Sequence, residues 1–254
     1  MPRPIAARRQ EDILGRLNIA GTVSVEELAE SFSVSRETIR RDLKNLARRG
    51  RLDVVHGGAQ RRASEAALPE RLGENPEGKA AIGQAAAGLV EDGMVVLLDS
   101  GPTTLKVAEA LSAKRELTIA TNSLPIALSM CRVPGTRVHM LGGEVDSTDE
   151  GAFGLEVIEA LDRFRFDLAF VAAAGISEDG EVTDFSRVAA QQRGRMLSTA
   201  KRAYLVADKS KFGRLTPIRI PDADRAAGLI VDAAPPLPII ERFRGRGAEI
   251  IVAE

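Results

Sequence analysis

Strand-like stretches alternate with helical segments along the last two-thirds of the chain, and this alternation is its most constraining feature. The clearest stretch is MVVLLD at residues 94–99, a continuous apolar run that is typical of a strand buried on both faces. Helical periodicity fills most of the gaps between such stretches. The pattern therefore predicts an α/β domain with a mostly parallel sheet covered by helices. The expected strands lie at 94–99, 117–121, 137–141, 167–174, 203–208, 228–232 and 249–253.

The first fifty residues follow a different pattern, with three short segments of helical periodicity. The second segment begins at Ser24, and Glu27 three residues later completes a capping box. The third begins after Ser35, a favourable N-cap residue. Only Ser33 and Val34 separate these two segments, so they predict a helix-turn-helix.

The third segment carries a cluster of cations outside its apolar stripe, which Ile39, Leu43 and Leu46 form. The whole chain has 35 Lys and Arg against 36 Asp and Glu, whereas residues 1–62 hold 13 and 8. On charge alone, a solvated helix surface is the simpler interpretation. In a helix-turn-helix, however, this helix fits the major groove of DNA, where Arg contacts guanine. The expected DNA-binding residues are Ser35, Arg36, Thr38, Arg40, Arg41 and Lys44, and the cluster continues to Arg48 and Arg49.

A β-hairpin is predicted directly after the third helix. Residues 52–55 favour a strand and His56-Gly57-Gly58 favour a turn, so the segment resembles the wing of a winged helix. We expect His56 and Gly57, with Arg61 and Arg62 beyond them, to lie along the sugar-phosphate backbone. Taken in isolation, His56 is more simply a loop histidine without a partner.

The segment VSVEELAESFSVSRETIRRDLKNLARRGRL, followed by HGGA at residues 56–59, closely resembles the N-terminal signature of the DeoR family of bacterial transcriptional regulators. The TIRRDL run at 38–43 and the HGGA run are the most specific parts of the match. The resemblance covers nearly all of residues 8–59. It implies binding to double-stranded operator DNA, with residues 35–44 as the recognition helix.

The expected domain organisation follows from these two patterns. Residues 1–59 form the predicted winged helix-turn-helix domain. Residues 60–78 are dominated by Pro, Gly and charged residues and are expected to be a linker or hinge. Residues 79–254 form the predicted domain for effector binding and oligomerisation.

Polar loops follow several of the predicted strands. The loop at residues 99–104 leaves a buried strand and opens a helix, so its amides, hydroxyls and helix dipole suit an anion. A capped helix start with a proline near its first position explains this loop about equally well. Because the carboxyl ends of parallel strands meet at one edge, four polar loops there favour a pocket over four separate caps. The loops are those at 99–104, 121–123, 142–143 and 208–211.

The same loops carry a second part of the resemblance. LLDSGPTT, ATNSLPIA, LGGE and ADKSKFG match recurring motifs of the DeoR-family effector domain, so the resemblance extends over roughly residues 8–232. It implies a fold similar to ribose-5-phosphate isomerase. It also implies that the effector is a phosphorylated sugar or polyol, which weakens binding to DNA. The effector-binding residues expected here are Asp99, Ser100, Gly101, Thr103, Thr104, Asn122, Gly143, Arg193 and Lys211.

The chain departs from the family pattern at positions where acids are usual. Ala174 stands where a Gly-Ala-Asp-Gly run places its aspartate, and Ala189 stands where a glutamate is common. Arg193 stands where a lysine is usual, and its guanidinium suits a phosphate or carboxylate. These departures favour a ligand with fewer anchored hydroxyls, or an unusual one.

Two alternatives to an effector-controlled regulator stay open. In one, the second domain only oligomerises. In the other, which we favour less, it is a sugar-phosphate isomerase, whose chemistry needs a carboxylate or similar base. Asp99, Asp184 and Asp208 are the candidate bases, although each has an ordinary loop or cap role. We expect no enzymatic activity and a regulator, most simply a repressor, of a sugar or polyol catabolic operon, although side chains alone do not separate a repressor from an activator. We also expect a dimer or tetramer, because a single winged helix reads only a short site.

Neither a metal nor a cofactor is expected. His56 and His139 are the only histidines and Cys131 the only cysteine, and their spacing resembles no zinc site. The single cysteine fits a reducing compartment. The segment MPRPIAARRQ lacks the apolar core of a secretory signal, and no apolar run approaches the ~18 residues of a membrane span. A cytoplasmic protein that does not bind membranes is therefore expected.

Overall fold

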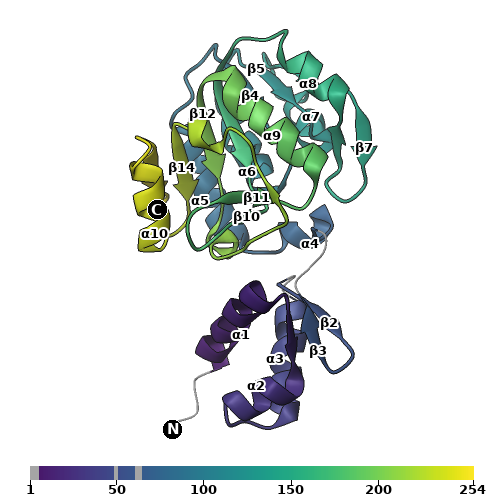
Figure 1. The fold of residues 1–254 in the computed structure, drawn as a ribbon. Coiled ribbons are helices and arrows are strands. Elements are labelled where there is room, and N and C mark those ends of the chain that lie inside the picture. Colours follow the sequence, from purple (N-terminus) through teal and green to yellow (C-terminus); the bar gives the residue numbers. More distant parts are fainter. Residues whose placement is uncertain (1–5, 49–50, 61–64) are drawn as a thin grey trace. The chain divides into compact units, whose positions relative to one another are not determined.

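The structure is a computed structural model that describes residues 6–48, 51–60 and 65–254 of the 254-residue chain. The chain divides into two compact units between Glu65 and Ala66 (Figure 1). Arg49, Arg61 and Arg62 lie outside the described residues. None of the helices in the described part of the chain is long and apolar enough to cross a membrane.

The first unit is a small bundle of helices with a three-stranded sheet. Its elements are α1 (Ala6–Ala20), β1 (Thr22–Ser24), α2 (Val25–Ser31), α3 (Arg36–Arg48), β2 (Asp53–Val55) and β3 (Gly58–Gln60). The antiparallel sheet has the order β1-β3-β2, so β1 adds a strand to the predicted hairpin. The sequence did not indicate β1, which has only three residues. The core includes Ile13, Leu17, Leu28, Ile39 and Leu43.

Local hydrogen bonds explain why the helix-turn-helix forms where the sequence predicts it. The Ser24 side chain accepts a hydrogen bond from the Glu27 amide at 3.0 Å and caps α2. Ser33 has a φ of 52°, so the chain turns sharply between α2 and α3. The Ser35 side chain accepts a hydrogen bond from the Thr38 amide at 3.1 Å, which satisfies a free donor at the start of α3.

A buried ion pair ties α1 to α3. Asp42 lies within the TIRRDL run but points inward, and its carboxylate accepts a hydrogen bond from Arg9 Nε at 2.6 Å. Gln10 donates to the other carboxylate oxygen at 2.8 Å. The acid of this motif is therefore structural, while the arginines next to it are exposed.

The second unit has a seven-stranded parallel sheet, with all seven strands close to their predicted positions. The strands are β4 (Val95–Leu98), β5 (Thr118–Thr121), β6 (Arg137–Met140), β9 (Phe166–Ala172), β12 (Ala200–Val206), β14 (Gly228–Val231) and β15 (Glu249–Val252). Their order is β15-β14-β12-β9-β4-β5-β6. This confirms the predicted α/β fold. Starting from the centre of the sheet, β4, β5 and β6 follow one another toward one edge. β9, β12, β14 and β15 follow one another toward the other edge.

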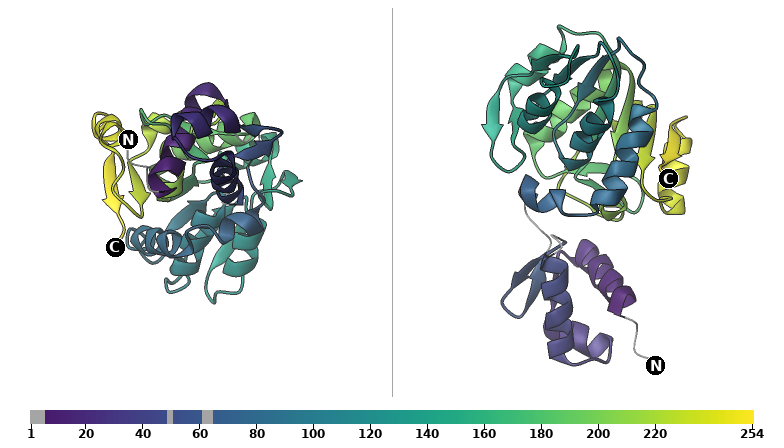
Figure 2. Two further views of the ribbon diagram at one scale, coloured as in Figure 1. Left: turned by 90° about the horizontal axis from the view of Figure 1, so that it is seen from below. Right: turned by 180° about the vertical axis from the view of Figure 1, so that it is seen from behind.

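Helices cover both faces of this sheet (Figure 2). One face packs against α5 (Pro76–Ala87), α6 (Pro102–Leu111) and α7 (Leu124–Met130). The other packs against α8 (Leu155–Leu161), α9 (Arg187–Thr199) and α10 (Leu237–Arg244). Alternate residues of each strand enter opposite cores: in β4, Val96 and Leu98 face the first helices, whereas Leu97 faces the second set. Burial on both faces explains the continuous apolar run of this strand.

Short strands absent from the sequence prediction extend the second unit. β7 (Glu144–Asp146) and β8 (Gly151–Phe153) form a hairpin, and β10 (Gly175–Ile176), β11 (Val182–Asp184) and β13 (Ile218–Arg219) form a separate small sheet. Each has two or three residues, which is too short for periodicity to reveal.

The segment expected to be a linker is partly helical. α4 (Leu68–Leu72) and the start of α5 fall within residues 60–78. The Leu68 amide donates to Thr148 O at 2.7 Å, and the buried Arg71 forms an ion pair with Asp149. Just beyond, the buried Lys79 ammonium donates to Arg71 O at 2.8 Å. Arg71, one of the charged residues that made this segment resemble a linker, is thus an anchor, because its guanidinium binds inside the second unit.

Candidate functional site

The outer face of α3 presents most of the predicted DNA-binding residues. Arg36, Arg40, Arg41 and Lys44 are exposed, as is Ser35, while Thr38 is half-buried. Arg36 forms an exposed ion pair with Glu26, and Arg40 lies 3.7 Å from Glu37. Among the described residues, Arg41 and Lys44 have no acidic partner. Exposed ion pairs contribute little, so all four cations are available to a polyanion.

The predicted wing is the tight turn between β2 and β3. Val55 pairs with Gly58, which leaves the exposed His56 and Gly57 at the tip, and Gly57 has a φ of 77°. Gly58 is needed for a different reason: a Cβ there would lie 2.1 Å from Val23 O in β1. The two glycines of the HGGA run therefore serve the turn and the close packing of the sheet.

The second candidate site lies where the direction of the sheet reverses. β4 and β9 are neighbours, but the chain proceeds from them toward opposite edges. In open parallel sheets, ligands bind beyond the carboxyl ends of the strands at this point. The loop after β4 begins with Asp99, Ser100 and Gly101, and the loop after β9 begins with Ala173. The sequence had identified the first loop from its residues alone.

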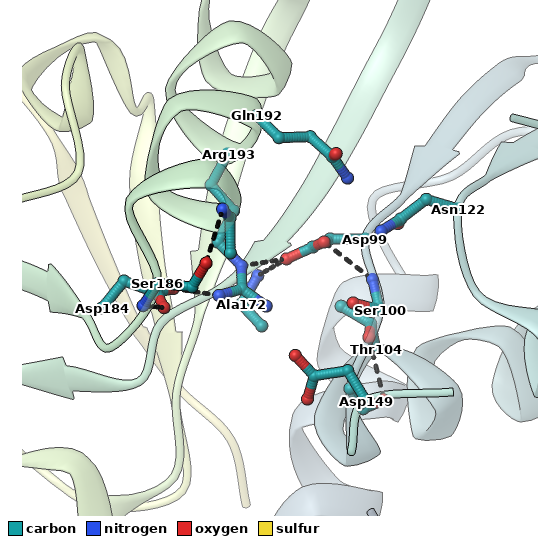
Figure 3. A network of polar contacts seen from close by, with 12 residues as sticks. Asp99, Ser100, Thr104, Asn122, Asp149, Ala172, Asp184, Ser186, Gln192 and Arg193 are labelled. Carbon is teal, nitrogen blue, oxygen red and sulfur yellow. Dashed lines mark hydrogen bonds and ion pairs between the residues drawn. The ribbon is translucent and has the colours of Figure 1, made fainter. Parts of the chain in front are cut away.

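Asp99 joins these two loops to α9. Its Oδ1 accepts a hydrogen bond from the Ser100 amide at 2.7 Å. Its Oδ2 accepts from the Ala172 amide at 3.1 Å and from Arg193 Nε at 2.8 Å (Figure 3). Burial raises the pKa of Asp99 above its ordinary value, against the opposing effect of Arg193 and the two amides. Both carboxylate oxygens of Asp99 are therefore already engaged.

Arg193 is enclosed by acids. Its guanidinium binds Asp99 on one side and, through Nη1, Asp184 of β11 on the other. Burial alone lowers the pKa of Arg193, but the carboxylates of Asp184 and Asp99, with Asp149 further away, hold it well above the ordinary value. The sequence suggested a cation ready for a phosphate. In the structure most of that charge is neutralised by the protein itself.

The N-terminus of α6 has donors without partners among the described residues. Gly101 occupies the N-cap position without a side-chain cap, and Pro102 takes the first turn. The Thr103 hydroxyl has no hydrogen-bond partner among the described residues, whereas the Thr104 hydroxyl donates to Gly101 O at 3.0 Å. Gly101 has a φ of 136°, a conformation suited to glycine. The free amides and the helix dipole at this end favour an anion.

Three buried oxygens next to Asp99 also lack partners among the described residues: Ser100 Oγ, Asn122 Oδ1 and Gln192 Oε1. The amino groups of Asn122 and Gln192 both donate to Ala152 O, at 3.1 and 3.3 Å. Gln192 was missed by the sequence prediction. Its only signal was a neutral polar residue among the small and apolar residues of the inner face of α9.

Gly143 and Lys211 have evident structural roles. A Cβ at Gly143, which has a φ of 144°, would lie 2.6 Å from Phe153 O of the β7–β8 hairpin. Lys211 is buried near Asp208, and Lys79 Nζ lies 3.8 Å from the same carboxylate. Burial raises the pKa of Asp208, but the charges of Lys211 and Lys79 outweigh that effect and lower it overall. Lys211 is thus another cation with an acid beside it.

Ala174 and Ala189, which the sequence comparison with the family pattern singled out, are both buried. Ala174 follows β9 and Ala189 lies in the first turn of α9. Within the described part of the chain, no group of three or more His, Cys, Asp or Glu residues could hold a metal ion.

Comparisons with known proteins assign both units. Residues 9–65 match the model of the DeoR-like helix-turn-helix domain, and residues 74–233 match that of the DeoR C-terminal sensor domain. The glycerol-3-phosphate regulon repressor of Escherichia coli K12 is 31% identical over 236 residues, covering 92% of this chain and 94% of the relative. The transcriptional repressor CsqR of the same organism is 30% identical over 248 residues, with 97% and 95% covered.

Among solved structures, ribose 5-phosphate isomerase A of Methanocaldococcus jannaschii is similar with a TM-score of 0.41 and 18% identity, covering 56% of this chain and 57% of that one. The matches to both family models, and the curated relatives that align over almost their whole length, lead to one conclusion. The chain belongs to the DeoR family of transcriptional regulators.

Proposed function

We propose that this regulator represses transcription by binding operator DNA through α3, and that a phosphorylated sugar or polyol releases it. The observation that carries the proposal is the uncapped N-terminus of α6 at the reversal point of the sheet, with the free Thr103 hydroxyl beside it. A phosphate bound there accepts hydrogen bonds from amides that have no other partner and gains from the helix dipole.

The DNA-binding half of the proposal rests on the first unit. Residues 1–59 carry it, with Ser35, Thr38 and the cations of α3 facing the major groove, and His56 and Gly57 of the wing along the backbone. Arg41 and Lys44 are the best candidates for direct contacts, because neither has to leave an acidic partner first.

The names of two relatives support the part of the proposal that concerns the effector. One is the glycerol-3-phosphate regulon repressor of Escherichia coli, and another is a putative aga operon transcriptional repressor. By analogy, the regulated genes serve sugar or polyol catabolism. We place the phosphate on Ser100, Gly101, Thr103 and Thr104, with Asp99, Asn122 and Arg193 around the rest of the ligand.

Isomerase activity is the weaker alternative. A base for proton abstraction needs a free carboxylate near the substrate. Asp99 and Asp184 both bind Arg193, and Asp208 has two lysines beside it. The relatives reported above are named as repressors. We therefore propose that the chain is not an enzyme.

The second unit is also proposed to oligomerise, as a dimer or tetramer, so that two or more winged helices bind one operator together. A single species of monomer mass in light scattering at micromolar concentration, with and without DNA, contradicts this part. We further propose that the protein acts in the cytoplasm, where its operator is accessible.

The effector site is tested by two substitutions at one position. Thr103→Asp places a carboxylate where the phosphate is expected. The helix dipole favours an acid in the first turn, and thermal melting checks that this buried position accepts the charge. We expect this variant to bind operator like the wild type and to ignore the effector. The control, Thr103→Val, removes only the hydroxyl and should weaken the response modestly.

The assay is fluorescence anisotropy of labelled operator, titrated with a panel of sugar and polyol phosphates and with inorganic phosphate. If no panel member changes operator affinity of the wild type, the second unit only oligomerises. If Thr103→Asp responds like the wild type, the phosphate binds elsewhere and the loop is only a helix start.

A further inference from the structure

Three unpartnered oxygens gather around one backbone segment of the second unit. Asn122 and Gln192 donate to the same carbonyl, Ala152 O, so their amide groups are neighbours. Ser100 lies against the preceding residue, because a Cβ built on Gly151 would be 3.3 Å from Ser100 Oγ. All three side chains are buried, and none of the three oxygens has a hydrogen-bond partner in the described part of the chain.

The orientation of the two amides follows from their shared acceptor. Turning either amide would place its oxygen against the oxygen of Ala152 and lose the bond. Asn122 Oδ1 and Gln192 Oε1 therefore do not bond to Ala152 O and stay available as acceptors. The Ser100 hydroxyl can both donate and accept.

The surrounding groups select the chemistry of a ligand. Asp99 lies beside these oxygens, and its own oxygens are engaged by Arg193 and two amides. A phosphate would meet acceptors here and is disfavoured, whereas hydroxyl groups can donate to the two amide oxygens. The amides are neutral, and neither Ala174 nor Ala189 has a polar side chain. The acceptors that remain thus suit neutral hydroxyls.

We propose that Asn122 and Gln192 form a subsite that binds at least two hydroxyl groups of a polyol-like ligand, with Gln192 as its specificity-determining residue and the Ser100 hydroxyl between this subsite and the phosphate. This inference rests on the proposed effector function, because it describes the part of the same site that holds the carbon chain. It separates the two ends of the ligand: the phosphate binds the α6 N-terminus, and the hydroxyls bind the amide oxygens.

The experiment uses matched pairs of probes on the full-length chain. Glycerol 3-phosphate is paired with n-propyl phosphate, and glucitol 6-phosphate with n-hexyl phosphate, so each pair shares its phosphate and carbon number. Isothermal titration calorimetry measures each Kd. A site built to bond hydroxyls rejects analogues that lack them, so at least one polyol phosphate should bind the wild type more than about tenfold tighter than its alkyl partner.

Two variants of α9 localise the effect. Gln192→Leu removes the acceptor at similar volume and should reduce the ratio within the pair to less than about threefold, with the alkyl phosphate unaffected. Gln191→Leu, at the exposed neighbouring position, should keep the wild-type ratio. Thermal melting checks that both fold. If Gln192→Leu does not fold, the affinity ratios of the wild type and of Gln192→Met within each probe pair test the proposal instead.

Each outcome has a fixed meaning. Equal affinities within both pairs, or a ratio that Gln192→Leu leaves unchanged, overturn the subsite. A different outcome is that free glycerol or glucitol binds as tightly as its phosphate ester, with an affinity that Gln192→Leu reduces. In that case the subsite stands and the phosphate part of the proposed function fails. If no probe binds at millimolar concentration, the three oxygens hold only buried water and the inference is overturned.

Discussion

The two units treat their cations in opposite ways. On α3, Arg41 and Lys44 are exposed and have no acidic partner among the described residues. In the second unit, Arg193 lies buried between two aspartates, and Lys79 and Lys211 are buried near Asp208. An exposed, unpaired cation attracts a polyanion from a distance, whereas a buried, paired one mainly holds structure. One chain therefore leaves these residue types exposed in one unit and buries them beside acids in the other.

This difference also separates how the two sites should discriminate. DNA binding through exposed cations depends strongly on salt, since each phosphate contact releases counterions. The strand-end site has little free positive charge, so we expect its selectivity to come from placed donors and acceptors. In the proposed site, the α6 amides are the donors, and Asn122 and Gln192 are the acceptors.

The largest expected effect comes from removing a buried cation. Arg193→Leu leaves Asp99 and Asp184 buried without their partner, which should lower the free energy of unfolding by about 3–5 kcal/mol. Urea denaturation followed by circular dichroism measures it. Arg41→Leu on the exposed face of α3 is the control and should change stability by less than about 0.5 kcal/mol. Similar losses in both variants would erase the contrast between the units.

A smaller effect is expected where the exposed cations act. Arg41→Ala should weaken operator binding by about 1–3 kcal/mol while leaving the melting temperature unchanged. Gel shifts at one fixed salt concentration test this, with Arg244→Ala on the exposed side of α10 as the control. Arg40→Ala should act in the same direction. Wild-type affinity in both α3 variants would show that α3 does not face the DNA.

The smallest expected effect is the pH dependence of the stability that Asp208, the acid beside the buried Lys79 and Lys211, contributes. The pKa of Asp208 is lowered in the folded chain, so its ionised form stabilises the fold above the ordinary pKa of 3.8, and this contribution is lost as the pH falls through the lowered value. The difference in unfolding free energy between the wild type and Asp208→Asn should therefore be constant near neutrality and shrink below about pH 4. A difference that grows on acidification has the wrong sign for this interpretation.

Much of the fold was predictable because its signals are local. A strand buried on both faces must be apolar throughout, and this requirement marks β4, β9 and β14 in the sequence. Caps such as Ser24 and Ser35 act over three residues, so they too are visible. The short strands of two or three residues have no such signal.

The site was only partly predictable, for a different reason. The polar loop after β4 follows from its position at a strand end. The clamp on Arg193 depends on Asp99, 94 positions earlier in the chain, and the role of Gln192 depends on a carbonyl 40 positions away. Partners at such separations are set by the tertiary fold. For the same reason, the buried guanidinium of Arg71 could not be distinguished from the charges of a linker. The assignments of individual residues to contacts with DNA or with the effector stay predictions.

The anchoring of α4 bears on how such a protein can be recombined with others. Leu68 and Arg71 bind the backbone and side chain of the turn between β7 and β8, through Thr148 and Asp149. A chimera that takes its sensor from this chain should begin no later than Ala66, where the second unit starts. A graft that begins at Lys79 would remove α4, strip Asp149 of its arginine and leave the buried lysine without the carbonyls of Arg71 and Glu74.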